Sequence, residues 1–346
     1  MIRIEALPAR DGDCLWVEWE HEGRTRRMLV DGGRGRAAAR RIEALSIDDR
    51  HVDLVVCTHI DADHIEGILD LFAQPPAGFT AGEVWFNGQR HLRDDVTGPR
   101  QGSRLELILG RAGVPWNARF GNGAVAVAED GPLPVKQLPG LTVTLLAPGP
   151  AELSSLDRAW PDVLAELDDP LQGRRGPDPD AGVDLAALVD RLSTPDESAA
   201  NGSSIAFLAE HADGGRVLFT ADAPAAPLLA GLRRLAPDGA PVPVALCKVP
   251  HHGSHHNVST ALVAALDCPN WLLSTSGAGH GHPDRRAIAR IVAGSPGATL
   301  WFNYASGTTA EYAEPGAHGY HAVHPAPGHE GIALEVENGR VTEVPL

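Results

Sequence analysis

The chain has few cysteines and no long apolar run, and both shortages exclude classes of protein. None of its 346 residues lies in a stretch near the roughly 18 apolar residues that span a bilayer. The first residues lack the basic-then-apolar layout of a secretory signal peptide. The four cysteines are scattered within or beside apolar runs, which indicates buried thiols and not a disulfide framework. We therefore expect a cytoplasmic protein without a membrane partner.

Positive charge is also scarce, since Lys136 and Lys248 are the only lysines and the formal net charge is −16. This balance counts against a broad, non-specific nucleic-acid surface, which needs cationic side chains to displace counterions. A small anionic substrate remains compatible, because bound divalent metal ions would reverse the charge locally. The preference for Arg, Ala and Pro over Lys is typical of a GC-rich bacterial genome.

Short apolar strands separated by turns and helices occupy both ends of the chain. Expected strands are Met1–Leu7, Cys14–Glu20, Arg27–Val30, Val52–Cys57, Glu83–Phe86, Leu141–Leu146, Ser204–Glu210, Gly215–Thr220, Val242–Val249, Trp271–Ser274, Thr299–Tyr304, Gly331–Glu337 and Arg340–Val344. Expected helices are Arg36–Leu45, Ile65–Phe72, Ser103–Ala112, Ala225–Leu235, Val258–Leu266 and Arg285–Ala293. The last two strands should form a hairpin, because Asn338-Gly339 favours a tight turn. The pattern predicts two sheets sandwiched between helices.

Residues 151–200 differ from the rest of the chain in composition and apolar pattern. Two amphipathic pieces, 153–167 and 183–192, flank a stretch rich in Asp, Pro, Gly and Arg at 168–182. We expect an inserted helical excursion with an exposed loop, which is a possible docking surface for a protein partner. The chain is then one domain, 1–346, with halves of about 1–150 and 201–346.

The densest group of metal-capable side chains lies in T-H-I-D-A-D-H, from Thr58 to His64, directly after an apolar strand. Imidazole and carboxylate groups hold Zn²⁺, Mn²⁺ or Fe²⁺. An extended segment would point His59, Asp61 and Asp63 the same way, with His64 where a helix begins. The alternative is an acidic helix N-terminus that complements the helix dipole, but this does not explain the two histidines. The segment therefore predicts a metal site.

More metal-capable groups follow other expected strands, where α/β proteins place their chemistry. Each has an ordinary alternative as a turn residue, a helix cap or a surface polar side chain. Together they favour a single site. They are Asp31, Asp222, the pair His251 and His252, and the pair His280 and His282.

These motifs resemble the metallo-β-lactamase superfamily, and within it the hydrolase domain of the ComEC/Rec2 competence proteins and their stand-alone relatives. The matching pieces, in the family's order, are Gly12–Cys14, Leu29–Gly33, Thr58–His64, Asn201–Ile205, Phe219–Asp222, Lys248–Ser254 and Gly279–Pro283. The resemblance implies an α/β (α+β) fold, a four-layer αββα sandwich, with a helical insertion.

The resemblance also implies a site for two divalent metal ions, Zn or Mn. One ion would be held by His59 and Asp61, the other by Asp63, His64 and His251, and Asp222 would bridge both. Asp31 would not bind an ion itself but would orient the side chains that do. The chain departs from the commoner pattern at two places, because Asp61 replaces a histidine and Asn201 with Ser204 replaces another. More oxygen ligands favour Mn²⁺, and more histidines favour Zn²⁺.

Catalytic roles follow from the same resemblance. Asp63 would accept a hydrogen bond from the attacking water, while His252 and His282 are preferred over His255 and His280 to hold a phosphate oxygen or protonate the leaving group. Lys248 is interpreted as a strand-end charge or a contact for the substrate anion. Two groups are expected mainly at the solvated surface, namely His255 with His256, and the late cluster of His318, His321, His324 and His329.

The expected function is metal-dependent hydrolysis of a phosphodiester by a phosphodiesterase or nuclease, with a small anionic or single-stranded nucleotide substrate. The alternatives are hydrolysis of a carboxylic ester, lactone or thioester on the same fold, and a non-catalytic metal-binding regulatory protein.

Overall fold

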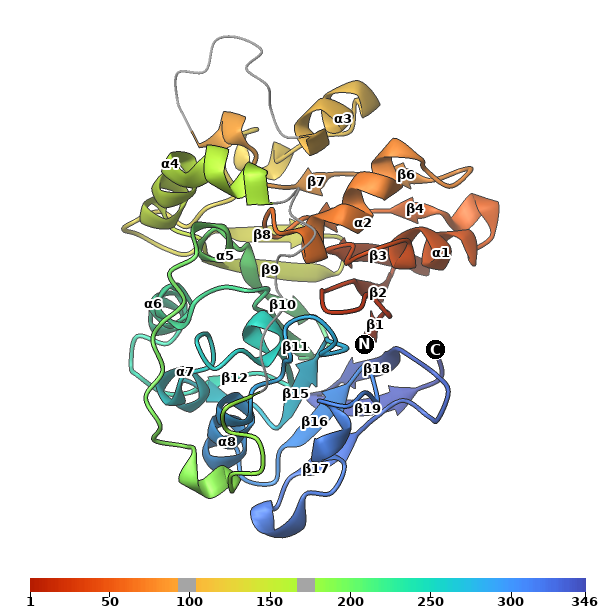
Figure 1. The fold of residues 1–346 in the computed structure, drawn as a ribbon. Coiled ribbons are helices and arrows are strands. Elements are labelled where there is room, and N and C mark those ends of the chain that lie inside the picture. Colours follow the sequence, from red (N-terminus) through yellow and green to blue (C-terminus); the bar gives the residue numbers. More distant parts are fainter. Residues whose placement is uncertain (93–103, 167–177) are drawn as a thin grey trace.

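A computed structural model describes residues 1–92, 104–166 and 178–346, and these form two stacked sheets with helices outside (Figure 1). The first sheet has the order β19-β18-β1-β2-β3-β5-β7. Its strands are β1 (Ile2–Ala6), β2 (Leu15–His21), β3 (Arg24–Val30), β5 (Leu54–Val56), β7 (Val84–Trp85), β18 (Ile332–Glu337) and β19 (Arg340–Val344).

The second sheet has the order β17-β16-β15-β13-β11-β10-β9-β8. Its strands are β8 (Val135–Leu138), β9 (Leu141–Ala147), β10 (Ala206–His211), β11 (Arg216–Phe219), β13 (Leu246–Lys248), β15 (Asn270–Leu273), β16 (Thr299–Phe302) and β17 (His321–Val323). Two short parallel pairs lie apart from the large sheets, β4 (His51–Val52) with β6 (Thr80–Ala81), and β12 (Val242–Pro243) with β14 (Leu266–Asp267).

Alternation along the strands divides the apolar side chains among three cores. Val17 and Phe207 point into the core between the sheets, whereas their neighbours Trp16 and Leu208 point outward. The outer face of the first sheet packs on α1 (Ala37–Glu43), α2 (Ala62–Ala73), α3 (Arg104–Ala112) and α4 (Pro150–Glu166). The outer face of the second packs on α6 (Ala225–Leu235), α7 (Thr260–Ala264) and α8 (Arg285–Gly294). The predicted four-layer α/β sandwich is confirmed.

Each sheet contains a run of parallel strands, and this brings several loops to one edge. β3 pairs with β5, and β11 pairs with β13, which pairs with β15, all in parallel. The loops after these strands therefore leave from their carboxyl ends, which is where α/β sheets form ligand sites. The C-terminal hairpin returns to the first sheet, where β18 pairs with β1.

The inserted region differs from the prediction in its second half. The piece at 153–167 is confirmed as α4, but 183–192 contains only one 3₁₀ turn, Leu185–Ala187. Leu185 and Leu188 are buried, so the amphipathic pattern is satisfied without a full helix. Residues 168–177 of the expected loop lie outside the described residues. α5 (Ala199–Gly202) then leads into β10.

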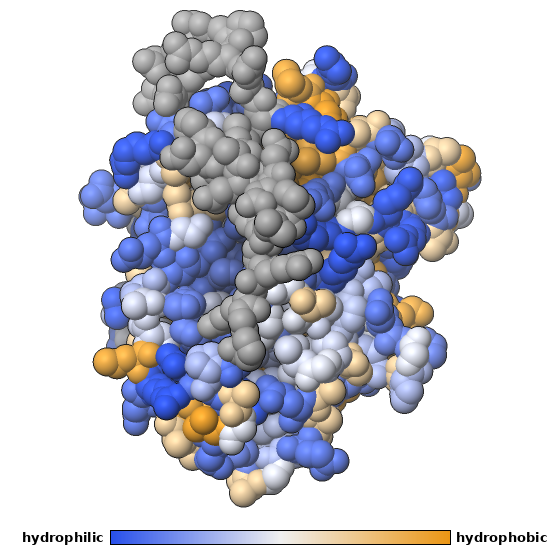
Figure 2. Space-filling view, viewed as in Figure 1, coloured by the Kyte–Doolittle hydropathy of each residue, from blue (hydrophilic) through white to orange (hydrophobic). Residues whose placement is uncertain are grey.

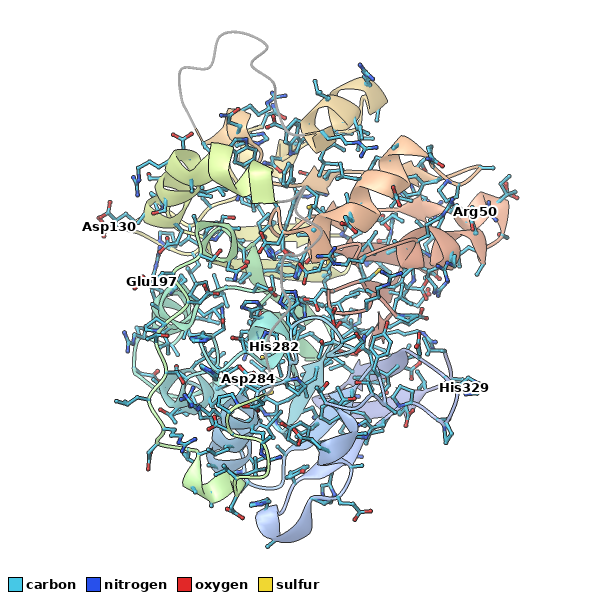
Figure 3. The ribbon with its side chains drawn as sticks, in the orientation of Figure 1. Arg50, Asp130, Glu197, His282, Asp284 and His329 are labelled. Atoms are coloured by element: carbon cyan, nitrogen blue, oxygen red, sulfur yellow. The ribbon has the colours of Figure 1, made fainter. Side chains whose placement is uncertain are left out.

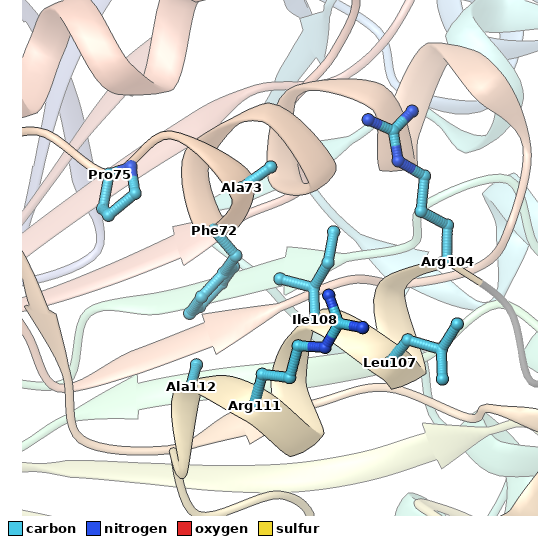
Figure 4. Close-up of a pocket in the computed structure, with 8 residues that line it drawn as sticks. All are labelled: Phe72, Ala73, Pro75, Arg104, Leu107, Ile108, Arg111 and Ala112. Atoms are coloured by element: carbon cyan, nitrogen blue, oxygen red, sulfur yellow. The ribbon is translucent and has the colours of Figure 1, made fainter.

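Hydrophilic residues cover most of the visible described surface (Figure 2). No helix in the described ranges is long and apolar enough to cross a membrane. A shallow groove between α2 and α3 combines apolar and cationic side chains, and Figure 4 shows Phe72 of α2 on the side of α3, which carries Arg104, Ile108 and Arg111. It contains none of the predicted site residues.

Two glycines set the position of α2 against the loop after β3. The Gly32 amide donates to the His64 carbonyl at 2.9 Å, and the Gly67 amide donates to the Gly33 carbonyl at 2.9 Å. A Cβ atom on Gly67 would lie only 2.1 Å from the Gly32 carbonyl oxygen. This close approach fixes the start of α2 beside the loop that carries Asp31.

We therefore expect Gly67→Ala to lower the free energy of unfolding by about 1–3 kcal/mol, because the backbone would have to move apart. Gly110→Ala in α3 is the matched control, since its added Cβ would meet no described atom within 4 Å. That change should be neutral or stabilising by up to about 1 kcal/mol. Urea denaturation of both variants tests this, and equal stabilities would contradict the packing argument.

Candidate metal centre

The strand-end loops of both sheets bring the predicted metal ligands together. Asp31 follows β3, and His59 follows β5. Asp222 follows β11, and the pair His251 and His252 follows β13. One expectation is corrected here, because α2 already begins at Ala62. Asp63 therefore extends from the first turn of the helix and does not continue an extended segment, whereas His64 lies at the start of a helix as predicted.

Several of these residues have strained backbones. Asp31, Ala221, His251 and His252 have positive φ angles of 59°, 48°, 45° and 54°. Such conformations cost energy for residues other than glycine and persist only where the surroundings enforce them. The Asp31 amide donates to the Val56 carbonyl at 2.8 Å, and the His251 amide donates to the Ala221 carbonyl at 3.0 Å. The strained loops are therefore tied to neighbouring strands.

One carboxylate oxygen lies at the centre of the cluster. Asp222 Oδ2 is 3.3 Å from His64 Nε2 and 3.4 Å from His252 Nε2. It is 3.6 Å from His251 Nε2 and 4.0 Å from His59 Nε2. All four histidines thus turn the same ring nitrogen toward one oxygen.

The outer ring nitrogens show which tautomer each neutral imidazole adopts. Nδ1 of His64 donates to Asp31 Oδ2 at 2.8 Å, and Nδ1 of His252 donates to the Ser274 carbonyl at 2.7 Å. Nδ1 of His59 lies 3.0 Å from Thr58 Oγ1, whose own proton is donated to Asp31. Because each partner accepts, the proton lies on Nδ1 and the Nε2 lone pair faces the centre.

His251 follows the same rule with different partners. Its Nδ1 lies 3.0 Å from Asn257 Oδ1 and 3.3 Å from Asp196 Oδ2. Burial raises the pKa of Asp196, but hydrogen bonds from His251 and Asn257 outweigh it and bring the value to about 2. Asp196 is therefore ionised at neutral pH and accepts the Nδ1 proton.

In these tautomers the Nε2 lone pairs of the histidines face one another, an arrangement that fits a bound cation. His64 Nε2 and His252 Nε2 are only 3.2 Å apart. The buried His59 Nε2 has no hydrogen-bond partner within the described chain. Some sets of three side chains have ligand atoms close enough to share one ion. Two overlapping sets are His59 with His64 and Asp222, and Asp63 with His64 and His252. The donor set therefore fits divalent metal ions.

The pKa shifts of His64 and Asp222 also indicate that the cluster favours a positive charge at its centre. Burial opposes protonation of His64, but Asp222, Asp31 and Asp63 outweigh it and raise its pKa well above the ordinary value. Burial likewise raises the pKa of Asp222, yet His252, His64 and His251 lower it well below normal. In the absence of an ion, protons on the histidines are thus the nearest available positive charge.

The second of the two adjacent histidines, His252, lies beside Asp63, with 3.6 Å between its Nε2 atom and Asp63 Oδ2. His252 is 2% exposed and belongs to a set of side chains that could hold a metal ion, whereas the sequence analysis assigned it a substrate-facing role. Asp61 is more open, with 29% of its side chain exposed, and lies 3.6 Å from His59 Nε2.

Lys248 is the last residue of β13, as predicted, and it is buried behind the cluster. Its Nζ pairs with Asp13 Oδ2, lies 3.6 Å from Asp222 Oδ1 and donates to the Ala221 carbonyl at 3.1 Å. Burial opposes its charge, but Asp13 and Asp222 outweigh that effect and raise the pKa of Lys248. Lys248 therefore supports Asp222 from the side opposite the histidines.

His280 and His282 lie beside the cluster. The His282 ring centroid is 5.4 Å from that of His251 and 6.1 Å from that of His280. Burial lowers the pKa of His282 to about 4, against the opposing effect of Asp284. Burial also lowers the pKa of His280. Both imidazoles are thus neutral at pH 7, and Nδ1 of His282 faces Asp284 Oδ1 at 3.4 Å.

Asn201 and Ser204 both lie near the predicted ligands. Asn201 Nδ2 donates to Asp196 Oδ2 at 2.7 Å and lies 3.4 Å from His251 Nδ1. The buried Asn201 Oδ1 and Ser204 Oγ have no hydrogen-bond partner among the described residues. Both oxygens are therefore available to a ligand or a water molecule.

The remaining histidines lie elsewhere. His256 donates to the Thr194 carbonyl, and His324 stacks on Phe302 with ring centroids 4.4 Å apart. Figure 3 shows His329 at the periphery, far from His282 near the middle. Sequence reasoning missed Asp13, Asp196 and Asn257 as site residues. Asp13 could have been found, because it precedes Cys14 in one of the matched motifs.

A family model described as the metallo-beta-lactamase superfamily matches residues 7–277. A search of curated proteins gives no match. Among solved structures, the chain is similar to a CmlA beta-hydroxylase E377D mutant, with 13% identity over 96% of this chain and 54% of that one and a TM-score of 0.39. A metallo-beta-lactamase of Cronobacter sakazakii with a HARLDQ motif has 15% identity over 81% and 84%, with a TM-score of 0.30.

A long form RNase Z from yeast has 11% identity over 100% of this chain and 49% of that one, with a TM-score of 0.41. The chain thus spans about half the length of the CmlA and RNase Z structures. The assignment to a family depends on the family model.

We expect Lys248→Met to lower the free energy of unfolding by about 3–5 kcal/mol in chelator, because Asp13 and Asp222 lose their buried counter-charge. Adding Asp13→Asn to that variant should recover part of the loss, since one uncompensated carboxylate is removed. Denaturant titrations of the single and double variants test this. A single variant as stable as the wild type would show that the pair does not stabilise the fold.

Proposed function

Because the chain belongs to the metallo-beta-lactamase superfamily, whose members are metal-dependent hydrolases, we propose that it is a phosphodiesterase or nuclease that acts with two divalent metal ions. The observation that carries the proposal is the convergence of four Nε2 atoms on Asp222 Oδ2. The ComEC/Rec2-like branch and a protein partner at residues 151–200 stay predictions.

The proposed ligands divide between two ions that share Asp222. One ion would be held by His59, Asp61 and His251, and the other by Asp63, His64 and His252. This allocation exchanges His251 and His252 relative to the sequence prediction, since His252 lies beside Asp63. Bound there, divalent ions, Zn or Mn, would lower the pKa of a water molecule and neutralise the charge of a phosphoryl group.

The chain's own groups would orient the reactants. Asp63, with 13% of its side chain exposed, can accept a hydrogen bond from the attacking water. His280 and His282, beside His251, are the proposed contacts for a phosphate oxygen or the leaving oxygen. Asp31 holds the Nδ1 proton of His64, which keeps Nε2 directed inward.

Divalent ions would supply the positive charge that a phosphodiester needs in an acidic chain. Each ion could bind a phosphoryl oxygen directly, whatever the charge of the surrounding carboxylates. The net charge of −16 on the whole chain disfavours a long duplex. We therefore propose a small anionic or single-stranded nucleotide substrate.

The first prediction concerns the metal. Protein purified without chelator or a histidine tag should contain two Zn or Mn ions per chain by elemental analysis. Treatment with chelator should lower the melting temperature, because bound ions stabilise the folded state. One ion or none after reconstitution would contradict the binuclear site and favour the regulatory alternative.

The second prediction concerns turnover. Asp222→Asn and His64→Ala should each lower kcat for bis-p-nitrophenyl phosphate by at least about 1,000-fold, about 4 kcal/mol of barrier, while the circular dichroism spectrum stays unchanged. His329→Ala at the periphery is the control and should retain activity. Hydrolysis of lactone, thioester or carboxylic ester reporters in place of the phosphodiester would contradict the proposed substrate class.

A further inference from the structure

The inserted region ends in a segment that crosses the outside of the second half of the molecule, and we call residues 178–198 the strap (Figure 1). Three arginines of α8 hold it. Arg285 donates to the Val183 carbonyl at 2.7 Å, and Arg286 donates to the Leu192 carbonyl at 2.9 Å. The buried Arg290 donates to the Ser193 hydroxyl at 2.8 Å. The strap is therefore fixed along its length.

Arg290 also links the strap to the loop after β13. The same guanidinium donates to the carbonyls of His255 and Val258, each at 2.8 Å. The strap and the loop that carries His251 are thus positioned by one side chain. Asp196, near the end of the strap, lies against this loop, and its backbone amide donates to the His256 carbonyl at 3.4 Å.

The Asp196 carboxylate connects three side chains of the site. Oδ2 accepts from Asn201 Nδ2 at 2.7 Å and from Asn257 Nδ2 at 2.9 Å, and lies 3.3 Å from His251 Nδ1. Oδ1 accepts from the Ser198 amide at 2.9 Å. Because a carboxylate accepts only, it fixes which end of each amide faces it.

Both amides are thereby oriented by Asp196. Asn257 must turn its oxygen to His251 Nδ1, and Asn201 keeps its Oδ1 on the other side from the carboxylate. A proton held on Nδ1 leaves the His251 lone pair on Nε2, toward Asp222. We propose that Asp196 is a positioning residue that the inserted region supplies to the metal site, where it sets the tautomer and direction of His251.

This inference rests on the proposed metal site, but Asp196 itself lies in the inserted region and outside the family motifs. Carboxylates that hold a ligand histidine typically account for 10–100-fold in metal affinity. The ion held by His251 should therefore be the weaker one in a variant that lacks the carboxylate, while the ion held by Asp63, His64 and His252 should bind as before.

The test compares Asp196→Asn with Glu197→Gln, which removes the same charge from the exposed neighbouring residue. In competition titrations with Zn²⁺ and a chromophoric chelator, Asp196→Asn should bind one ion about 10–100-fold more weakly and the second unchanged. Glu197→Gln should bind both as the wild type does. The visible absorption of Co²⁺-loaded protein should change in Asp196→Asn only, because a ligand histidine is redirected.

Asp196→Ser gives a second, smaller replacement should the buried amide of Asp196→Asn prevent folding, and the same loss is expected. Wild-type affinities and an unchanged Co²⁺ spectrum in either folded variant would overturn the role of Asp196 while leaving the metal site intact. Wild-type protein that binds no Zn²⁺ would instead overturn the proposed function, and with it this role.

Discussion

The structure of the site depends on which groups face each of the two carboxylate oxygens of Asp222. Oδ1 faces the ammonium group of Lys248, and Oδ2 faces the Nε2 atoms of four histidines. A buried carboxylate with an ammonium group on one side and imidazoles on the other keeps its plane, since turning that plane would take both oxygens away from these partners. The strained Ala221 backbone and the buried Asp13–Lys248 pair both serve that orientation. The hydrophobic sandwich brings the loops together, and this carboxylate determines how they fit.

The correct and the incorrect predictions of secondary structure from the sequence both have physical causes. Strands and helices with a strong apolar pattern were found, and α6 and β19 have the predicted bounds. The start of α2 was missed because six residues do not distinguish a period of 2.0 from one of 3.6. Val242–Val249 reads as one strand, but it divides into β12 and β13 in different sheets. Only the positions of neighbouring strands decide that division.

The site residues show the same limit. The motif His251-His252 is visible in the sequence, yet both residues have positive φ, and the sequence does not say which ring turns toward Asp63. Lys248 looks like a surface charge until Asp13, from the other sheet, is placed against it. Asp196 lies in a stretch without periodicity, and the arginines of α8 determine its position. Contacts between distant segments decide all three cases.

The pairing of β18 with β1 joins segments that are far apart in the sequence. β1 has β2 on one side and β18 on the other, and β18 and β19 follow the other strands of both sheets in the sequence. Without this pairing one edge of β1 would present unpaired backbone groups, and Ile2 and Ile4 would lack the cover of Leu334 and Val336. The C-terminal hairpin thus closes the apolar layer between the sheets on which the loops of the site rest.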